Sequence, residues 1–180
     1  MICVFLAEGF EEIEALTPVD FLRRCELPVK MVGVGAPVAT GSHGIPVVCD
    51  LTAADLALDE VEAVILPGGM PGTLNLEKSD VVQAAIRKCA AEEKVVAAIC
   101  AAPSILGHMG LLAGRKATCF PGFEEQLVGA EVTGKPVEQD GVFITSKGAG
   151  TASQFAFALA ERFCSPERAK ALWESVQWQW

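Results

Sequence analysis

The spacing of apolar residues along the chain changes repeatedly between two patterns. Short runs that are apolar throughout predict buried β-strands, and segments with apolar residues every three or four positions predict helices. The expected strands are residues 2–6, 29–34, 61–66, 95–99 and 116–120, with a small antiparallel excursion ending at 45–48 and a hairpin of 137–140 and 142–146. The expected helices are residues 11–25, 79–93, 103–109, 151–163 and 166–176.

Near-continuous apolar strands that alternate with helices are typical of a parallel sheet covered on both faces. We therefore expect an α/β fold, a three-layer sandwich with a mostly parallel sheet. The 180 residues fit one domain, residues 1–180, because no repeat, low-complexity segment or linker divides them. Within this domain, Pro18 should kink the first helix and Ser79 is a candidate N-cap of the second. Ligands of such sheets bind beyond the carboxyl ends of the strands.

Composition and charge exclude several classes of protein. Hydrophobic residues make up 51% of the chain, which is enough to bury a core and excludes intrinsic disorder. The 14 Lys and Arg residues against 23 Asp and Glu give a net charge of −9, so nucleic acid is not an expected partner. Residues 95–114 carry no formal charge, but Pro103, Ser104, His108 and three glycines interrupt them. A membrane is therefore not an expected partner either.

The cysteines and the N-terminus indicate the compartment. The apolar start of the chain follows no basic region and runs into glutamates, unlike a signal peptide. The seven cysteines are an odd number, and the closest two are 11 positions apart. Neither a CxxC pair nor the disulfide framework of a secreted protein is present in this spacing. We expect reduced thiols in a cytoplasmic protein, and no metal site built from these cysteines.

Cys100 is the candidate nucleophile. It stands between the strand 95–99 and the helix 103–109, with Ala98 and Ala102 two positions to either side. This is the pattern of a nucleophile elbow, in which the next backbone N–H points at a developing oxyanion. The start of the following helix should lower the pKa of the thiol. The alternative is that Cys100 is a packing residue, as we expect of the other six cysteines.

Two further segments carry candidate chemistry. Four acids follow the first strand, and most of them should be solvated in the first turn of a helix: Glu8, Glu11, Glu12 and Glu14. Glu14 shares a helix face with Phe10 and Thr17, so it could point inward. The loop of residues 66–72 (LPGGMPG) is either a plain connection or a nest of backbone amides that can hold an anion.

Taken together, these segments resemble the DJ-1/ThiJ/PfpI superfamily, and within it the DJ-1-like branch. The matching segments are residues 7–14 (AEGFEEIE) with 17–20 (TPVD), 64–69 (VILPGG), 97–103 (AAICAAP) and 145–151 (TSKGAGT). Four ordered motifs that span nearly the whole chain are a more specific signal than any one of them. The resemblance implies a flavodoxin-like sandwich and a homodimer.

The resemblance also implies roles for individual residues. Cys100 would be an oxidation-sensitive nucleophile, and Glu14 would be a buried, protonated acid that touches its sulfur. The amides of Gly69 and Ala101 would form the oxyanion site. Four further residues are expected at the pocket under the same alignment: Gly68, His43, Cys119 and Phe120. Cys119 would be either a resolving thiol or a packing residue.

Histidine is missing where relatives carry it. Members of the peptidase-like branch have histidine directly after the cysteine, where this chain has Ala101, so a peptidase is not expected. Members of the DJ-1-like branch often have histidine where this chain has Phe120. Of the two histidines present, His108 is expected to be a satisfied core residue. His43 falls near the place of a basic residue that reaches a neighbouring subunit's pocket in the family.

Three functions remain open. The first is a glyoxalase or deglycase, which would act on reactive dicarbonyls or glycation adducts through Cys100 and Glu14 without a cofactor. The second is an oxidative-stress sensor based on oxidation of Cys100. The third is a chaperone-like protein whose exposed surface would be the Trp-rich residues 173–180, where Trp173, Val176 and Trp180 share a helix face. That stripe is more typical of a helix that packs on its own domain.

Overall fold

The computed structural model describes residues 1–177, and seven of its strands form one central sheet. In sheet order these are β10 (Val137–Asp140), β11 (Phe143–Ser146), β7 (Val95–Ile99), β6 (Ala63–Leu66), β1 (Ile2–Leu6), β2 (Val29–Gly33) and β5 (Leu51–Thr52). All neighbours pair in parallel except β10 with β11. The run β2-β1-β6-β7-β11 has the strand order of flavodoxin-like sheets.

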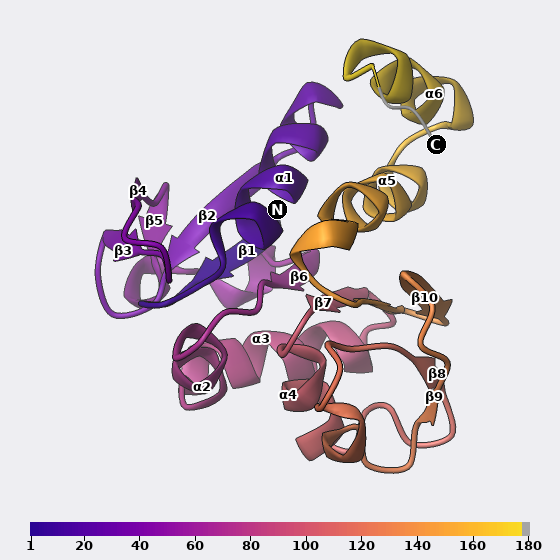
Figure 1. Cartoon of the computed structure of the whole chain (residues 1–180). Coiled ribbons are helices and arrows are strands. Elements are labelled where there is room, and N and C mark those ends of the chain that lie inside the picture. The colour runs from indigo at the N-terminus through magenta and orange to yellow at the C-terminus, as the bar shows by residue number, and fades with distance from the viewer. Residues whose placement is uncertain (178–180) are drawn as a thin grey trace.

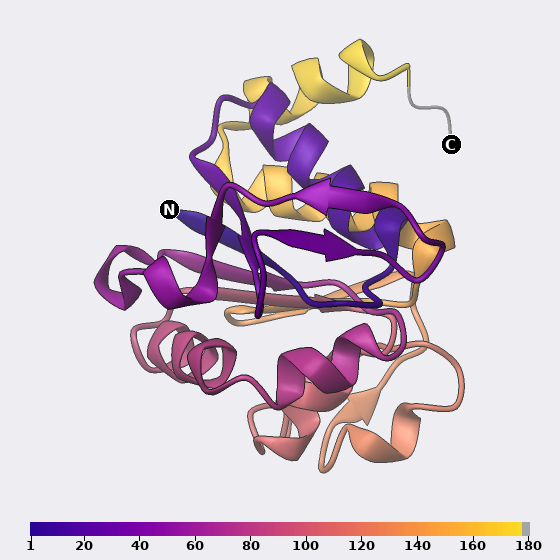
Figure 2. The ribbon, with the colours of Figure 1, turned by 90° about the vertical axis from the view of Figure 1, so that its left-hand side faces the viewer.

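Helices cover both faces of the sheet, as Figures 1 and 2 show. One face carries α1 (Glu12–Arg24) and α5 (Ala152–Phe163), with α6 (Pro166–Ser175) packed outside them. The other face carries α2 (Gly72–Glu77), α3 (Asp80–Ala91) and α4 (Pro103–His108). Short 3-10 helices lie at Ala53–Asp55, Leu58–Glu60, Glu124–Gln126 and Ala149–Thr151. The predicted three-layer α/β sandwich is confirmed.

Two apolar clusters, one on each side of the sheet, hold the layers together. Along β1, Val4 joins the cluster under α1 and α5, and the next residue, Phe5, joins the cluster over α3 and α4. This alternation follows from the two-residue repeat of a strand. Fully buried side chains such as Phe155 and Ile86 each stabilise the fold by about 1.5–3 kcal/mol.

Most local predictions agree with the structure. The hairpin of β10 and β11 turns at Gly141, and β3 (Val38–Thr40) pairs antiparallel with β4 (Pro46–Val48). Ser79 caps α3, because its side-chain oxygen accepts a hydrogen bond from Val82 N at 3.4 Å. Pro18 lies inside α1, which continues past it to Arg24 as one helix.

The predicted strand of residues 116–120 is wrong. Only β8 (Lys116–Ala117) is extended there, and it pairs with β9 (Glu131–Val132) in a separate small sheet. The next backbone groups are engaged elsewhere: Thr118 N donates to Thr145 Oγ1 at 2.9 Å, and Phe120 N donates to Cys100 O at 2.8 Å. These bonds draw the segment toward the end of the main sheet instead of into a ladder.

The prediction that His108 is a core residue is also wrong. Its side chain is 41% exposed, and its Nδ1 lies 2.5 Å from Glu77 Oε1. The end of the short helix α4 therefore lies at the surface rather than in the core.

The C-terminal helix packs on the domain, as its stripe predicted. The ring centroid of Trp173 lies 4.8 Å from that of Phe157 in α5, and Val176 packs against the same cluster. Trp180, the third residue of the stripe, lies outside the described residues. Within the described part of the chain, no helix combines the length and the apolar character that crossing a membrane requires.

Candidate active site

Cys100 lies at a strained turn between β7 and the segment that leads into α4. Its φ is +66°, in the left-handed region that costs a non-glycine residue free energy. Two backbone hydrogen bonds hold this turn: Cys100 N donates to Ser146 O at 2.9 Å, and Phe120 N donates to Cys100 O at 2.8 Å. Ala101 and Ala102 behind it are buried, so small side chains allow the turn. Cys100 itself is half-buried.

Glu14 reaches this sulfur from the first turns of α1. Its side chain is 1% exposed, and its Oε2 accepts a hydrogen bond from Gly68 N at 2.9 Å. The carboxyl group is also hydrogen-bonded to the Cys100 thiol and to the amide of Ala149. An acid that faces the core instead of solvent is thus held by two loops that follow different strands, β6 and β11.

The predicted oxyanion amides also lie at the sulfur. The backbone N–H groups of Gly69 and Ala101 both hydrogen-bond to Cys100 and favour its charged form. Gly69 can present its amide because its φ is +88°, a conformation that glycine adopts without strain. The structure therefore brings Cys100, Glu14, Gly69 and Ala101 together from three separate segments of the chain.

Gly68 lies against the side chains of both Cys100 and Glu14. A Cβ atom at this position would lie 2.7 Å from Cys100 Cβ, 2.7 Å from Glu14 Oε2 and 3.1 Å from Ala101 N. These distances are shorter than van der Waals contact, so any side chain here would separate the acid from the thiol. The first glycine of the loop 66–72 thus serves close approach rather than a simple turn.

The pKa values of the two groups change in the same direction. Burial raises the pKa of Glu14 to about 7, with hydrogen bonds from Cys100 and Gly68 acting against it. Burial, and then the negative charge of Glu14, raises the pKa of Cys100 to about 12. The prediction that the elbow lowers the thiol pKa is wrong, because desolvation and a neighbouring acid outweigh the amides of Gly69 and Ala101.

This order of ionisation decides how a thiolate can form. Near neutral pH, Glu14 loses its proton before Cys100 does. The pair then holds one proton, which the thiol and the carboxylate can share across their hydrogen bond. This arrangement allows a thiolate to form by proton transfer from Cys100 to Glu14.

Phe120 and Cys119 lie beside the site in different ways. Phe120 is 47% exposed, and one of its ring carbons lies 3.2 Å from where a Cβ of Gly148 would stand. That same position is 3.7 Å from Glu14 Oε1, so the ring borders the acid. Cys119 is 3% exposed and belongs to the apolar cluster over α3 and α4. This burial favours its interpretation as a packing residue.

His43 is engaged by Glu12 rather than by the thiol. Its Nδ1 lies 3.0 Å from Glu12 Oε2, and its backbone N donates to Glu12 Oε1 at 2.9 Å. Glu12 is 5% exposed, so the prediction of a solvated acid is wrong for this residue. The hydrogen bond that His43 donates to the Glu12 carboxylate raises the pKa of His43.

A cation could be held at this cluster, since ligand atoms of Glu11, Glu12 and His43 lie within 4.8 Å of one another. Ser42 Oγ already donates to Glu11 Oε2 at 3.1 Å, and Glu12 already accepts the two bonds from His43. The cluster is thus explained by its own hydrogen bonds and ion pairs. The expectation of a metal-free site stays a prediction.

Sequence reasoning assigned no role to the amide of Ala149, which bonds to Glu14. The signal was present, because residues 148–151 follow a strand at its carboxyl end and belong to a matched motif.

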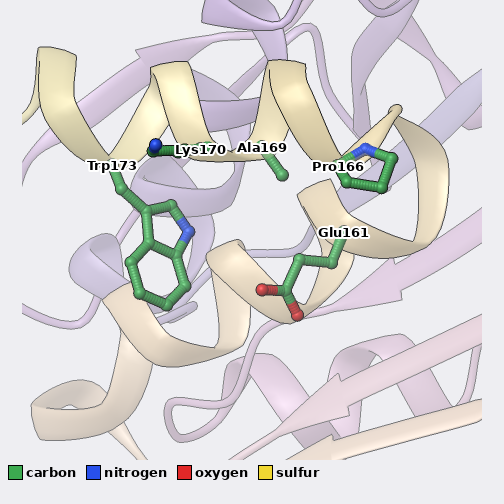
Figure 3. Close-up of a pocket in the computed structure, with 5 residues that line it drawn as sticks. All are labelled: Glu161, Pro166, Ala169, Lys170 and Trp173. Atoms are coloured by element: carbon green, nitrogen blue, oxygen red, sulfur yellow. The ribbon is translucent and has the colours of Figure 1, made fainter.

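A surface pocket of about 410 Å³ lies elsewhere, between α5 and α6 (Figure 3). None of the predicted site residues lines it; its lining residues are Glu161, Pro166, Ala169, Lys170 and Trp173.

Comparison with known proteins gives a consistent result. Residues 1–162 match the model of the DJ-1/PfpI family. The chain is 36% identical to protein dj-1beta of Drosophila melanogaster over 168 residues. This alignment covers 92% of this chain and 90% of the relative. It is 35% identical to deglycase PfpI of Pyrococcus furiosus over 147 residues, an alignment that covers 80% of this chain and 87% of that relative.

The fold agrees with solved structures of such proteins. Oxidized DJ-1 of Toxoplasma gondii superposes with a TM-score of 0.94 at 30% identity, and the match covers 99% of this chain and 98% of that chain. The family match over residues 1–162 includes every residue of the site described above.

Proposed function

Because the chain belongs to the DJ-1/PfpI family, we propose that it acts on small reactive dicarbonyls or on the glycation adducts they form, as a glyoxalase or deglycase. The observation that supports this most strongly is the buried hydrogen bond between Glu14 and the Cys100 thiol, beside the amides of Gly69 and Ala101. The reaction requires a nucleophile, an acid or base with a pKa near neutral, and an oxyanion site.

The proposed reaction begins with the transfer of the Cys100 proton to Glu14. The thiolate adds to the aldehyde carbon of methylglyoxal, and the amides of Gly69 and Ala101 stabilise the alkoxide that forms. Glu14 then moves a proton from this carbon to the neighbouring one through an enediol, which leaves a thioester on Cys100. Water hydrolyses the thioester and releases lactate, or glycolate when glyoxal is the substrate. The sequence of steps needs no added cofactor.

Formation of lactate from methylglyoxal tests the proposal. Wild-type protein should form lactate, and the Cys100→Ala variant should form none. Cys89→Ala is the matched control, because Cys89 is fully buried in the apolar cluster over α3 and remote from Glu14. Lactate formation by folded Cys100→Ala at the wild-type rate would exclude the proposed nucleophile.

A second candidate function rests on the same thiol, because Cys100 is half-buried and reachable by a peroxide. Two molecules of hydrogen peroxide would oxidise its thiolate to a sulfinate and leave as two waters. A protonated Glu14 would donate a hydrogen bond to a sulfinate oxygen. Intact mass spectra with peroxide would show the sulfinate in wild type and, in Glu14→Asp, further oxidation or a disulfide. Prompt sulfonate in wild type would contradict the sensor function.

We also propose a homodimer in the cytoplasm. Large apolar side chains are exposed on α1 and on the neighbouring β3–β4 hairpin, where a second copy would cover them: Ile13, Val38, Ile45 and Val48. Sedimentation of the wild type should give twice the chain mass, and Ile45→Lys should shift it to the monomer. A monomeric wild type would contradict this part of the proposal.

A further inference from the structure

Two cysteines outside the proposed active site end two neighbouring helices. Cys25 follows the last residue of α1, and its N–H donates to Phe21 O at 3.2 Å. Cys164 follows the last residue of α5, and its N–H donates to Ala160 O at 2.8 Å. The two helices lie side by side on one face of the sheet (Figure 2), and the ring centroids of Phe21 and Phe157 are 5.1 Å apart.

The two thiols contact each other at this junction. They share a hydrogen bond, and both line one surface pocket of about 330 Å³. Cys25 is 6% exposed and Cys164 is half-buried, so solvent reaches the pair from the side of Cys164. Both belong to the same apolar cluster, whose packing fixes the two helix ends. A disulfide requires two thiols that are held as neighbours, as these two are at the packed ends of α1 and α5.

Arg168 gives this pair a different electrostatic environment from that of Cys100. It lines the same pocket and pairs with Glu26, with Nη2 2.9 Å from Oε1. Burial and the neighbouring thiol raise the pKa of Cys25 to about 11, and the guanidinium of Arg168 acts against this. The positive charge of Arg168 acts on Cys25 in the direction of the thiolate, which is the reactive form in thiol oxidation.

We propose that Cys25 and Cys164 form a second redox site, at which a hydroperoxide converts the two thiols to an intramolecular disulfide. The Cys164 thiolate attacks a peroxide oxygen, the O–O bond breaks, and Cys164 becomes a sulfenic acid while water leaves. The sulfur of Cys25 then attacks the sulfenic sulfur. The hydroxyl group leaves as water with the thiol proton, so two thiols and one hydrogen peroxide give one disulfide and two waters.

The disulfide would join the C-terminal ends of α1 and α5 and close a loop that contains most of the chain. Such a loop restricts the unfolded state, so the melting temperature should rise by about 5–10 °C on oxidation. Glu14 lies three turns earlier in α1, so the link leaves the Cys100 site in place. This site is therefore independent of the proposed dicarbonyl chemistry, and its test does not use that activity.

Peptide mapping under non-reducing conditions tests the proposal. The full chain is treated with hydrogen peroxide, its remaining thiols are alkylated, and trypsin is added. Trypsin releases residues 25–30 (CELPVK) and 163–168 (FCSPER), each with a single cysteine. Wild type should yield these two peptides joined by a disulfide, and a reductant should separate them. Cys164→Ser should lose the linked peptide and the rise in melting temperature.

Cys49→Ser is the matched control, because Cys49 is also a half-buried cysteine but does not line this pocket. It should retain the linked peptide. Three results would overturn the proposal: Cys25 still alkylated after Cys164 has been oxidised to a sulfinate, either cysteine linked to a third one, or a disulfide that joins two chains on a non-reducing gel. The test uses Cys164→Ser because Cys25 is more buried, and a substitution at Cys25 could prevent folding.

Discussion

The two ends of helix α1 place different partners beside a thiol. Near its start, Glu14 contacts Cys100, and at its end Cys25 contacts Cys164. Burial raises the pKa of both thiols, to about 12 for Cys100 and about 11 for Cys25. The difference lies in the partner: a carboxyl group can accept and return a proton, whereas a second thiol can only share one or form a bond. The partner, more than the thiol's burial, therefore decides the chemistry we expect at each end.

The largest effect should come from removing the proton acceptor at Cys100. Glu14→Gln keeps the size of the side chain but cannot take the thiol proton, so kcat/KM for methylglyoxal should fall by ~10²-fold or more. Lactate assays over a range of substrate concentrations measure this, with circular dichroism to verify folding. Activity within a factor of two of wild type would assign the base elsewhere.

The next effect should come from the close approach of the loop at Gly68. In Gly68→Ala the added methyl group would press on Cys100 and on Glu14 Oε2, each 2.7 Å away. The displaced pair should lose ~10-fold or more in kcat/KM, because small misplacements of reacting groups are costly. Gly150→Ala is the control, since a Cβ there meets no atom within 4 Å. Equal activities of the two variants would contradict the described geometry.

The free energy of unfolding should also depend on the ionisation of Glu14. The pKa of Glu14 is about 7 in the folded protein, raised by burial from 4.5, so between these pH values the folded state keeps a proton that the unfolded state has lost. The free energy of unfolding should therefore fall as pH rises from 4.5 to 7, by up to roughly 3 kcal/mol. Urea denaturation across this range should show the slope in wild type and a flatter profile in Glu14→Gln.

The smallest effect should be that of His43. Because its ring pairs with Glu12 rather than with Cys100, His43→Ala should keep methylglyoxal activity within about a factor of two, well below the loss expected for a general acid or base. The lactate assay decides this as well. A loss of ~10²-fold would mean that His43 takes part in the reaction, from its own subunit or from a partner's.

The sequence predicted the parts of the molecule that follow from local pattern. The apolar runs of β1, β6 and β7 and the motifs around Cys100 and Glu14 sufficed for the fold and for the candidate pair. The strand predicted at 116–120 failed because Thr118 and Phe120 bond to Thr145 and Cys100, residues distant in sequence. Bonds of this kind have no local signature.

Burial and contacts between distant elements could not be predicted from the sequence either. Glu12 follows the same acidic pattern as its neighbours, yet His43 and the hairpin loop cover it. The pKa of Cys100 depends on desolvation and on Glu14, which a helix-terminus argument leaves out. The contact between Cys25 and Cys164 joins residues far apart in the chain, so cysteine spacing alone could not show it.

The proposed function depends on control of the Cys100 thiol by Glu14. Its most direct test is the rate at which iodoacetamide alkylates Cys100, followed by mass spectrometry from pH 5 to pH 9 in wild type and Glu14→Gln. In wild type the rate should rise through the pKa of Glu14, about 7, and then level off. In Glu14→Gln the rate should show no inflection there and should continue to rise to higher pH. The same profile in both proteins would show that Glu14 does not control this thiol.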